Sequence, residues 1–397
     1  MTLDRRTLIH AAAGALALGA ASPRFSFAAT PGDRRLIVIV LRGAMDALAA
    51  VPPHGDADYS RVRGSLALTK GQGGIIDLDG SFGLHPALVT FKSLWDQKQL
   101  AIVQAVASPY RDRSHFNGQN VIETGAIQPN GLPDGWLNRA LRPMGVGDPR
   151  LALAVAQAVP VILQGSRPVS SWMPMQLPQA DADFLARLKK LYEGDPIFRS
   201  ALDTAIEVNA AADASGMAKE PGAMRGARQY QFEPIAKMAG NLIAGAGGPT
   251  ITVLEVNGWD THEAQGTTQG RLAYVLADFD KGIKALADAI RPVWERTTIL
   301  AVTEFGRTVA PNGSGGTDHG TASAAFVLGG AVNGGRVLGQ WPGLRALHEG
   351  RDLAPTMDLR AVFKGVLGDH MRVARGQLEA VFPDSGNVAP LGGMIRS

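Results

Sequence analysis

The sequence predicts an α/β protein in which a doubly wound, mostly parallel central sheet is flanked by helices. Two observations lead to this class. Short apolar, strand-like runs alternate along the chain with segments of helical periodicity. Residues 36–41, the run Leu-Ile-Val-Ile-Val-Leu, are apolar at every position. Such a run is typical of a strand buried on both faces, as the strands of parallel sheets are.

The individual elements follow from the same two patterns. Strands are expected at residues 36–41, 100–106, 250–256, 297–302 and 324–328, with further candidates at 151–156 and 159–163. Helices are expected at residues 86–95, 116–123, 272–290 and 357–367. In the longest of them, apolar residues recur at helical spacing from Leu272 to Ile290, which predicts one buried face.

The pattern of apolar residues changes at residues 181–247. Leucines at helical spacing replace the strand pattern here, and a break rich in small residues interrupts it at 215–222. We expect a helical insertion on the α/β body, so that residues 29–397 form one α/β domain.

The first 28 residues have the three parts of a twin-arginine signal peptide. Arg5-Arg6 precedes a weakly apolar run at residues 11–21, and residues 26–28 place small side chains where a signal peptidase reads. We expect cleavage after Ala28, contact with the twin-arginine translocase, and a final location in the periplasm or beyond. An ordinary secretory signal carrying two arginines is the alternative. No later run is apolar enough to predict a stable membrane span.

Composition narrows the function classes. The chain has 397 residues, of which 45% are apolar and 19% charged, as in ordinary globular proteins. Its formal net charge is only +3 and no dense basic stripe is present, so nucleic acid is not an expected partner. The sequence contains no cysteine, so no disulfide framework is possible and any metal must be held by oxygen and nitrogen.

Charged and nucleophilic side chains lie beside five of the expected strands. Ligands of open α/β sheets bind beyond the carboxyl ends of the strands. If the sheet is parallel, these side chains should therefore converge on one edge. Asp46 follows the first strand, Ser114 and His115 the second, Asp260 and His262 the third, and Glu304 and Arg307 the fourth, while Asp318 and His319 precede the fifth.

The residue types in these loops predict a metal centre. Carboxylate oxygens and imidazole nitrogens are the ligands of Zn²⁺, Mg²⁺, Mn²⁺ and Ca²⁺. We expect one or two divalent ions, with Zn²⁺ before Mg²⁺, Mn²⁺ or Ca²⁺; two ions would lie about 4 Å apart. The candidate ligands are Asp46, Asp260, His262, Glu304, Asp318 and His319.

The loop at residues 108–115 predicts a nucleophile. Ser114 stands at an expected helix start, where the helix dipole and a neighbouring ion lower the pKa of a hydroxyl. Arg113 or Arg307 would clamp the anionic group of a small ester substrate. His115 completes the expected catalytic set.

Each of these residues also has a structural interpretation. Asp46 and Ser114 both stand where the N-cap of a following helix is expected. Asp260 and His262 are close enough in the sequence to pair with each other, and Glu304 and Arg307 to form an ion pair.

Six short motifs carry a family resemblance. Residues 41–46, 82–86, 108–116, 258–262, 303–307 and 317–320 resemble, in order, the motifs of a bacterial twin-arginine-exported family known as the domain of unknown function numbered 1501. That family is grouped with the alkaline phosphatase and sulfatase superfamily. The resemblance covers nearly all of the chain beyond the signal.

The resemblance implies a metal-dependent hydrolase of phosphate or related sulfate esters. It places Asp46 at the first metal-binding aspartate, Asp260 and His262 at an Asp/His ligand pair, and His319 at the late histidine ligand. Phe305 stands where the superfamily commonly has a second ligand after Glu304, and no cysteine is available for a formylglycine. A non-catalytic binding or accessory protein on the same fold is therefore the second hypothesis.

Overall fold

The computed structural model describes residues 33–173, 182–214, 231–245 and 247–396. The predicted signal peptide at residues 1–28 and the predicted break at 215–222 lie outside these residues. In the part of the chain that is described, no helix combines the length and the apolar content that crossing a bilayer requires.

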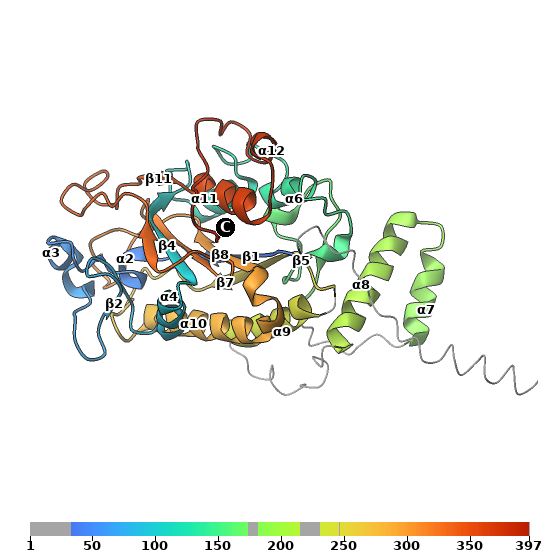
Figure 1. Cartoon of the computed structure of the whole chain (residues 1–397), viewed down its shortest axis with the longest axis horizontal. Helices are drawn as coiled ribbons and strands as arrows, with labels where there is room; N and C mark the ends of the chain where they lie inside the picture. The colour runs from blue at the N-terminus through green and yellow to red at the C-terminus, as the bar shows by residue number, and fades with distance from the viewer. Residues whose placement is uncertain (1–32, 174–181, 215–230, 246, 397) are drawn as a thin grey trace, which may run out of the picture.

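A nine-stranded sheet forms the centre of the described residues, with helices on both faces (Figure 1). Its order is β10-β4-β9-β8-β1-β7-β5-β6, and β11 pairs with β4. All pairings are parallel except those of β9 with β8 and β4. The mostly parallel class is therefore confirmed. The strands are β1 (Arg35–Arg42), β4 (Leu100–Ala107), β5 (Ala152–Ala154), β6 (Ser170–Ser171), β7 (Ile251–Asn257), β8 (Thr297–Thr303), β9 (Ser323–Leu328), β10 (Arg336–Leu338) and β11 (Met357–Asp358).

The central strand β1 shows why the expected run is apolar throughout. Successive side chains of a strand point to opposite faces. Ile37 and Ile39 enter one core, and Leu36 and Val38 enter the other. The first core is closed by α4 (Val89–Asp96), α9 (Phe232–Ala244) and α10 (Arg271–Ala289), and the second by α6 (Trp136–Leu141), α11 (Leu359–Gly365) and α12 (Arg375–Val381).

Two expected elements differ in the structure. The candidate strand at 159–163 is a short 3₁₀ turn over Val161–Leu163, because this apolar run is buried without joining the sheet. The expected helix at 357–367 begins later, since Met357–Asp358 pairs with β4 and the Asp358 carboxylate caps α11 at Arg360 N.

The helical segment at 181–247 contains three helices in its described parts. α7 (Ala182–Leu191) and α8 (Pro196–Ala214) stand beside the body (Figure 1). An Arg150–Glu207 ion pair of 3.1 Å ties α8 to the body. α9 instead packs along α10 on the sheet.

Strand direction brings the predicted loops to one edge. The carboxyl ends of the parallel strands β1, β4, β7 and β8 share that edge. Because β9 runs the opposite way, its amino end lies there too, together with the loop that precedes it. Convergence of this last loop therefore depends on an antiparallel strand, whereas the sequence expectation assumed a parallel one.

A glycine allows two of these loops to approach closely. Gly43, at the end of β1, has a φ of +119°, and a Cβ there would lie 2.6 Å from the backbone nitrogen of Asp260. A larger residue would push the Asp260 loop away from β1. The loop at the end of β1 thereby sets the position of Asp260.

Candidate metal centre

Three histidines and one aspartate gather at this edge of the sheet. His115 is the first residue of α5 (His115–Thr124), Asp260 and His262 follow β7, and His319 precedes β9. Asp260 Oδ1 lies 3.0 Å from His262 Nε2 and 3.5 Å from His319 Nε2, and Asp260 Oδ2 lies 3.5 Å from His115 Nε2. One ligand atom from each of His115, Asp260 and His319 lies within 4.8 Å of the others.

In all three histidines an oxygen atom holds Nδ1. His319 Nδ1 is 2.8 Å from the Arg113 carbonyl, His262 Nδ1 is 3.2 Å from Asp318 Oδ1, and His115 Nδ1 is 2.8 Å from Glu304 Oε1. Carbonyl and carboxylate oxygens only accept, so each Nδ1 carries the proton that it donates. In the neutral rings each Nε2 therefore keeps its lone pair, as a metal-ligating histidine requires.

The Nε2 atoms meet in a way that suits a cation. His262 Nε2 lies only 2.9 Å from His319 Nε2, and two unprotonated nitrogens at that distance repel each other. His115 Nε2 is buried and has no hydrogen-bond partner. A cation among the three rings relieves both problems, whereas a proton on His262 or His319 relieves only the first. Three imidazole nitrogens with one carboxylate also form a donor set that suits Zn²⁺.

Charges inside the cluster shift the protonation of its members. The carboxylates of Asp260 and Glu304 raise the pKa of His115 to about 9. Burial raises the pKa of Asp260, but the neighbouring His115, His319 and Arg307 side chains outweigh it and lower that pKa well below its usual value. Without an ion, His115 is thus protonated and faces an ionised Asp260. Binding a cation would release that proton.

Glu304, a predicted ligand, lies behind the cluster rather than in it. Its side chain is fully buried, and Oε1 accepts hydrogen bonds from Gly43 N, His115 Nδ1 and Gln119 Nε2. Its Oε2 accepts from the Thr303 hydroxyl at 2.9 Å. Burial raises the Glu304 pKa, and the bonds from these donors, His115 first, lower it further than burial raises it. The carboxylate orients His115.

Asp46, another predicted ligand, is not brought into the cluster. Its Oδ1 caps α2 (Ala47–Ala50) by accepting from Leu48 N and Ala49 N. Its Oδ2 accepts from the buried Arg63 guanidinium and from Gln265 Nε2 at 2.6 Å. The structural interpretation, an N-cap, describes what this carboxylate does.

Both predicted anion clamps are already paired. Arg307 is buried and binds Asp260 Oδ1 through Nη1 at 2.5 Å, while its Nε and Nη2 bind Thr317. Arg113 binds Asp352 at 2.8 Å and also pairs with Glu349. Arg307 therefore holds Asp260, a candidate ligand, and Arg113 contributes its carbonyl to His319.

Ser114 takes the expected place at the start of α5. It occupies the N-cap, but its side chain makes no capping hydrogen bond, so a capping serine is not what the structure shows. The residue is half-buried and directly precedes His115 in the chain. Its hydroxyl is therefore not used to cap α5.

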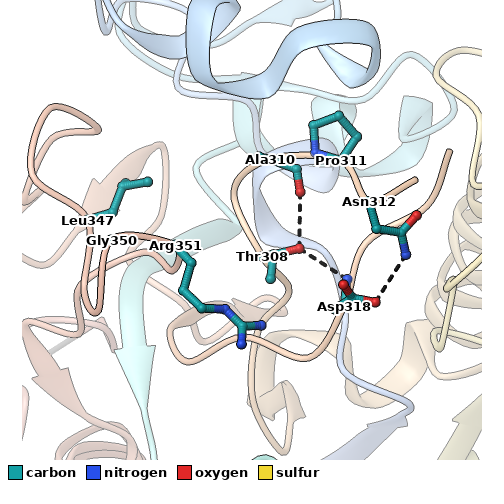
Figure 2. A pocket seen from close by; sticks show the side chains of 8 residues that line it. All are labelled: Thr308, Ala310, Pro311, Asn312, Asp318, Leu347, Gly350 and Arg351. Atoms are coloured by element: carbon teal, nitrogen blue, oxygen red, sulfur yellow. Dashed lines mark hydrogen bonds between the residues drawn. The ribbon is translucent and has the colours of Figure 1, made fainter. Parts of the chain in front are cut away.

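Asp318 links the cluster to a surface groove of about 490 Å³ (Figure 2). The carboxylate bonds His262 on one side and Asn312 Nδ2 at 3.0 Å on the other. Arg351 lies across the groove, half-exposed, and donates to the His319 carbonyl at 2.6 Å. Thr308, Ala310, Pro311, Leu347 and Gly350 line the rest.

The supporting residues were not found from the sequence. Arg63, Gln119 and Gln265 contact the predicted residues but stand in no motif that marks them. Arg63 is 17 residues from Asp46 and Gln119 is 185 from Glu304. No local spacing signals such contacts.

A mostly parallel sheet carrying a histidine–aspartate cluster at its carboxyl edge places the protein among α/β proteins with a candidate metal centre. The chain belongs to the family described as a protein of unknown function, DUF1501, whose profile matches residues 95–382. No curated protein matches the sequence.

Three solved structures give distant similarities. The phosphonate monoester hydrolase of Agrobacterium radiobacter is 12% identical with a TM-score of 0.40, covering 86% of this chain and 74% of that one. Murine ectonucleotide pyrophosphatase/phosphodiesterase 5 is 11% identical with a TM-score of 0.31, and the match covers 69% of this chain but only 57% of the murine one. The C-terminal periplasmic domain of EptC from Escherichia coli is 9% identical with a TM-score of 0.35, covering 75% and 72%.

Proposed function

We propose that this protein is an exported hydrolase of phosphate or sulfate esters that requires a divalent ion, Zn²⁺ first. The observation that carries the proposal is the set of three histidine Nε2 atoms around Asp260, each ring held by an oxygen at Nδ1. His115, His262, His319 and Asp260 would hold the ion. A bound divalent ion polarises an ester oxygen and stabilises developing negative charge.

Ser114 is the proposed nucleophile. Its hydroxyl lies at the amino end of a ten-residue helix, where peptide N–H groups and the helix dipole favour negative charge. The same N–H groups would bind an anionic oxygen of the ester, a task that the paired Arg113 and Arg307 do not have free guanidinium groups to perform. The serine oxygen would bond to phosphorus or sulfur as the bond to the alcohol oxygen breaks, with a neighbouring base taking the serine proton and the leaving alcohol gaining one. Water would then cleave the serine ester, which releases phosphate or sulfate and restores the hydroxyl.

The groove beside Asp318 would receive the alcohol part of the ester. Its walls offer apolar contacts from Pro311 and Leu347 together with the Arg351 guanidinium (Figure 2). Replacing Arg351 by alanine should raise KM for large esters and leave KM for a small aryl ester unchanged. An equal change for both esters would remove the groove from the proposal.

Export through the twin-arginine route completes the proposal. The signal at residues 1–28 supports it, and a route for folded proteins suits a centre loaded with its ion before export. Replacing Arg5 and Arg6 by lysines should keep the chain in the cytoplasm. Fractionation that still finds this variant in the periplasm would point to the ordinary secretory route.

The central test measures ion content and turnover together. Natively exported protein should retain a divalent ion and hydrolyse at least one aryl phosphate, phosphodiester or aryl sulfate. Ser114→Ala should lower kcat at least about 100-fold while ion affinity stays within about threefold, because the serine is not a ligand. A protein that retains no ion and cleaves none of these esters would refute the proposal.

A binding protein on the same fold is the second candidate. The observation that favours it is the pairing of both Arg113 and Arg307 within the protein. Ion binding without hydrolysis of any ester in the panel would support this candidate over the hydrolase.

A further inference from the structure

Asp46 and the histidine cluster belong to one polar network, but the positive charge that balances each of them has a different origin. We propose that the centre holds a single divalent ion, and that the Arg63 guanidinium supplies the positive charge that Asp46 requires. This inference rests on the proposed function, since it concerns the same centre. It assigns a role to Arg63 and removes Asp46 from the ligands.

The lone pairs of the Asp46 carboxylate are already used by hydrogen bonds within the protein. A carboxylate offers about four lone-pair positions. Leu48 N and Ala49 N take those of Oδ1 at 3.1 and 3.2 Å, and Arg63 and Gln265 take those of Oδ2. The residue is 1% exposed. No lone pair is left for an ion unless one of these four donors leaves.

The Arg63 guanidinium is held next to Asp46 by further buried partners. Its side chain is completely buried, and besides Asp46 it donates through Nη1 to the carbonyls of Thr308 and Val309, at 3.2 and 2.9 Å. Moving the guanidinium would strand those carbonyls and a buried charge, which costs several kcal/mol. A second ion at Asp46 would have to displace a cation that is built into the fold.

A chain of hydrogen bonds connects Asp46 to Asp260 in the cluster. Gln265 donates to Asp46, and its Oε1 accepts from the Thr317 hydroxyl at 2.8 Å. Arg307 donates to the same hydroxyl at 3.1 Å and to Asp260 Oδ1 at 2.5 Å. This path gives Asp46 a positioning role for Asp260, with no contact to the ion.

The other buried carboxylate among the predicted ligands gives the same result. Glu304 accepts four hydrogen bonds, and none of its side chain is exposed. Within residues 33–173, 182–214, 231–245 and 247–396, one group of at least three histidine or carboxylate ligand atoms within 4.8 Å of one another is found, formed by His115, Asp260 and His319, with His262 beside it. One such group of ligand atoms predicts one bound ion.

The test counts ions and measures their affinity on the mature chain. Metal-free protein is titrated with Zn²⁺ and, separately, with Mn²⁺, and the bound metal is measured by elemental analysis and calorimetry. The wild type should bind one ion per chain. Asp46→Asn should still bind one ion with affinity within about tenfold, as expected for a residue that acts through others. Two ions in the wild type, or a loss of more than about 100-fold in Asp46→Asn, would overturn the inference.

Two further variants keep the test decisive. If Asp46→Asn does not fold because Arg63 is left unpaired, the double variant Asp46→Asn/Arg63→Gln removes both charges and should also bind one ion. His319→Ala is the matched ligand control and should lose at least about 100-fold in affinity. Failure of the inference appears as two bound ions or as lost affinity in Asp46→Asn, whereas failure of the proposed function appears as no bound ion or as a bound ion without hydrolysis of any ester, so the two are distinguishable.

Discussion

Two polar groups at the same edge of the sheet differ in what their side chains leave unbonded. In the histidine cluster, the Nε2 atoms of His262 and His319 face each other at 2.9 Å, and Asp260 keeps 39% of its side chain exposed. Asp46 and Glu304 are buried, and all their carboxylate oxygens accept hydrogen bonds. The histidine cluster therefore offers nitrogen and oxygen atoms to an ion, whereas the carboxylate oxygens of Asp46 and Glu304 already have hydrogen-bond partners within the protein.

This difference separates two kinds of consequence for mutation. A buried and fully bonded group fixes geometry, so its loss should appear in the free energy of unfolding. A half-exposed side chain whose nitrogen or oxygen atoms lack partners within the protein contributes little to the free energy of unfolding, so its loss should lower the affinity for the ion instead. The following predictions test this separation, beginning with the largest expected effect.

Replacing Arg63 by methionine should cost about 3–5 kcal/mol in the free energy of unfolding, because it leaves Asp46 as an unpaired buried charge. Denaturant unfolding of the metal-free protein measures this. The matched control is Arg61→Met on the same helix, α3 (Tyr59–Arg63), whose partner Asp58 lies at the surface. That control should cost at most about 1 kcal/mol. Equal losses would show that burial does not distinguish the two arginines.

Acid should destabilise the protein through His370. The ring is buried and its Nε2 donates to the Arg35 carbonyl at 2.8 Å, and burial lowers its pKa from 6.5 to about 4. Between these values only the unfolded chain binds the proton, so stability is complete above pH 6.5 and falls as the pH is lowered toward 4. The loss should reach about 3 kcal/mol.

Unfolding measured from pH 7.5 to pH 4 checks this expectation against His370→Gln, which cannot titrate. The variant should show a flatter profile over the same range. If both proteins lose the same free energy between pH 6.5 and pH 4, other groups carry the acid sensitivity.

Replacing His319 by alanine should lower Zn²⁺ affinity at least about 100-fold, which is about 2.7 kcal/mol of binding free energy. Its side chain is about 25% exposed, so the free energy of unfolding of the metal-free protein should change far less than in Arg63→Met. Competition with a chelating dye measures the affinity. A large loss of stability with unchanged affinity would reverse the roles assigned to the two groups.

Asp318→Asn should have the smallest effect, about a tenfold loss in ion affinity. The carboxylate is 54% exposed and touches the centre only through His262 Nδ1, so it would orient the proposed ligand His262 without binding the ion itself. Stability should stay within about 0.5 kcal/mol of the wild type. Loss as large as that of His319→Ala would make Asp318 a ligand itself.

Much of the fold was predictable because burial leaves a local signature. The run at residues 36–41 is apolar at every position since both faces of β1 are covered, and α10 shows its buried face by the spacing of Leu272 and Leu276. Such patterns depend on neighbours in the sequence. The direction of β9 has no such signature, and it brings His319 to the site.

The site was predictable as a set of loops and less so as a set of roles. His115, Asp260, His262 and His319 were all singled out, and the structure brings them together, although His115 was assigned to catalysis rather than to a ligand position. Asp46 and Glu304 are also carboxylates that follow a strand. Their oxygens already accept hydrogen bonds, several of them from residues distant in the sequence such as Arg63, Gln265 and Gln119.

By itself, the sequence determined the mostly parallel sheet, the loops that carry the chemistry and the oxygen and nitrogen ligands to which a cysteine-free chain is restricted. Only the tertiary structure decided which of those side chains keep open donor atoms. A lone pair is open or closed according to partners such as Arg63, Gln265 and Gln119, which fold in from other segments. Residue type sets what a side chain can bind, and its three-dimensional neighbours determine whether it is still free to do so.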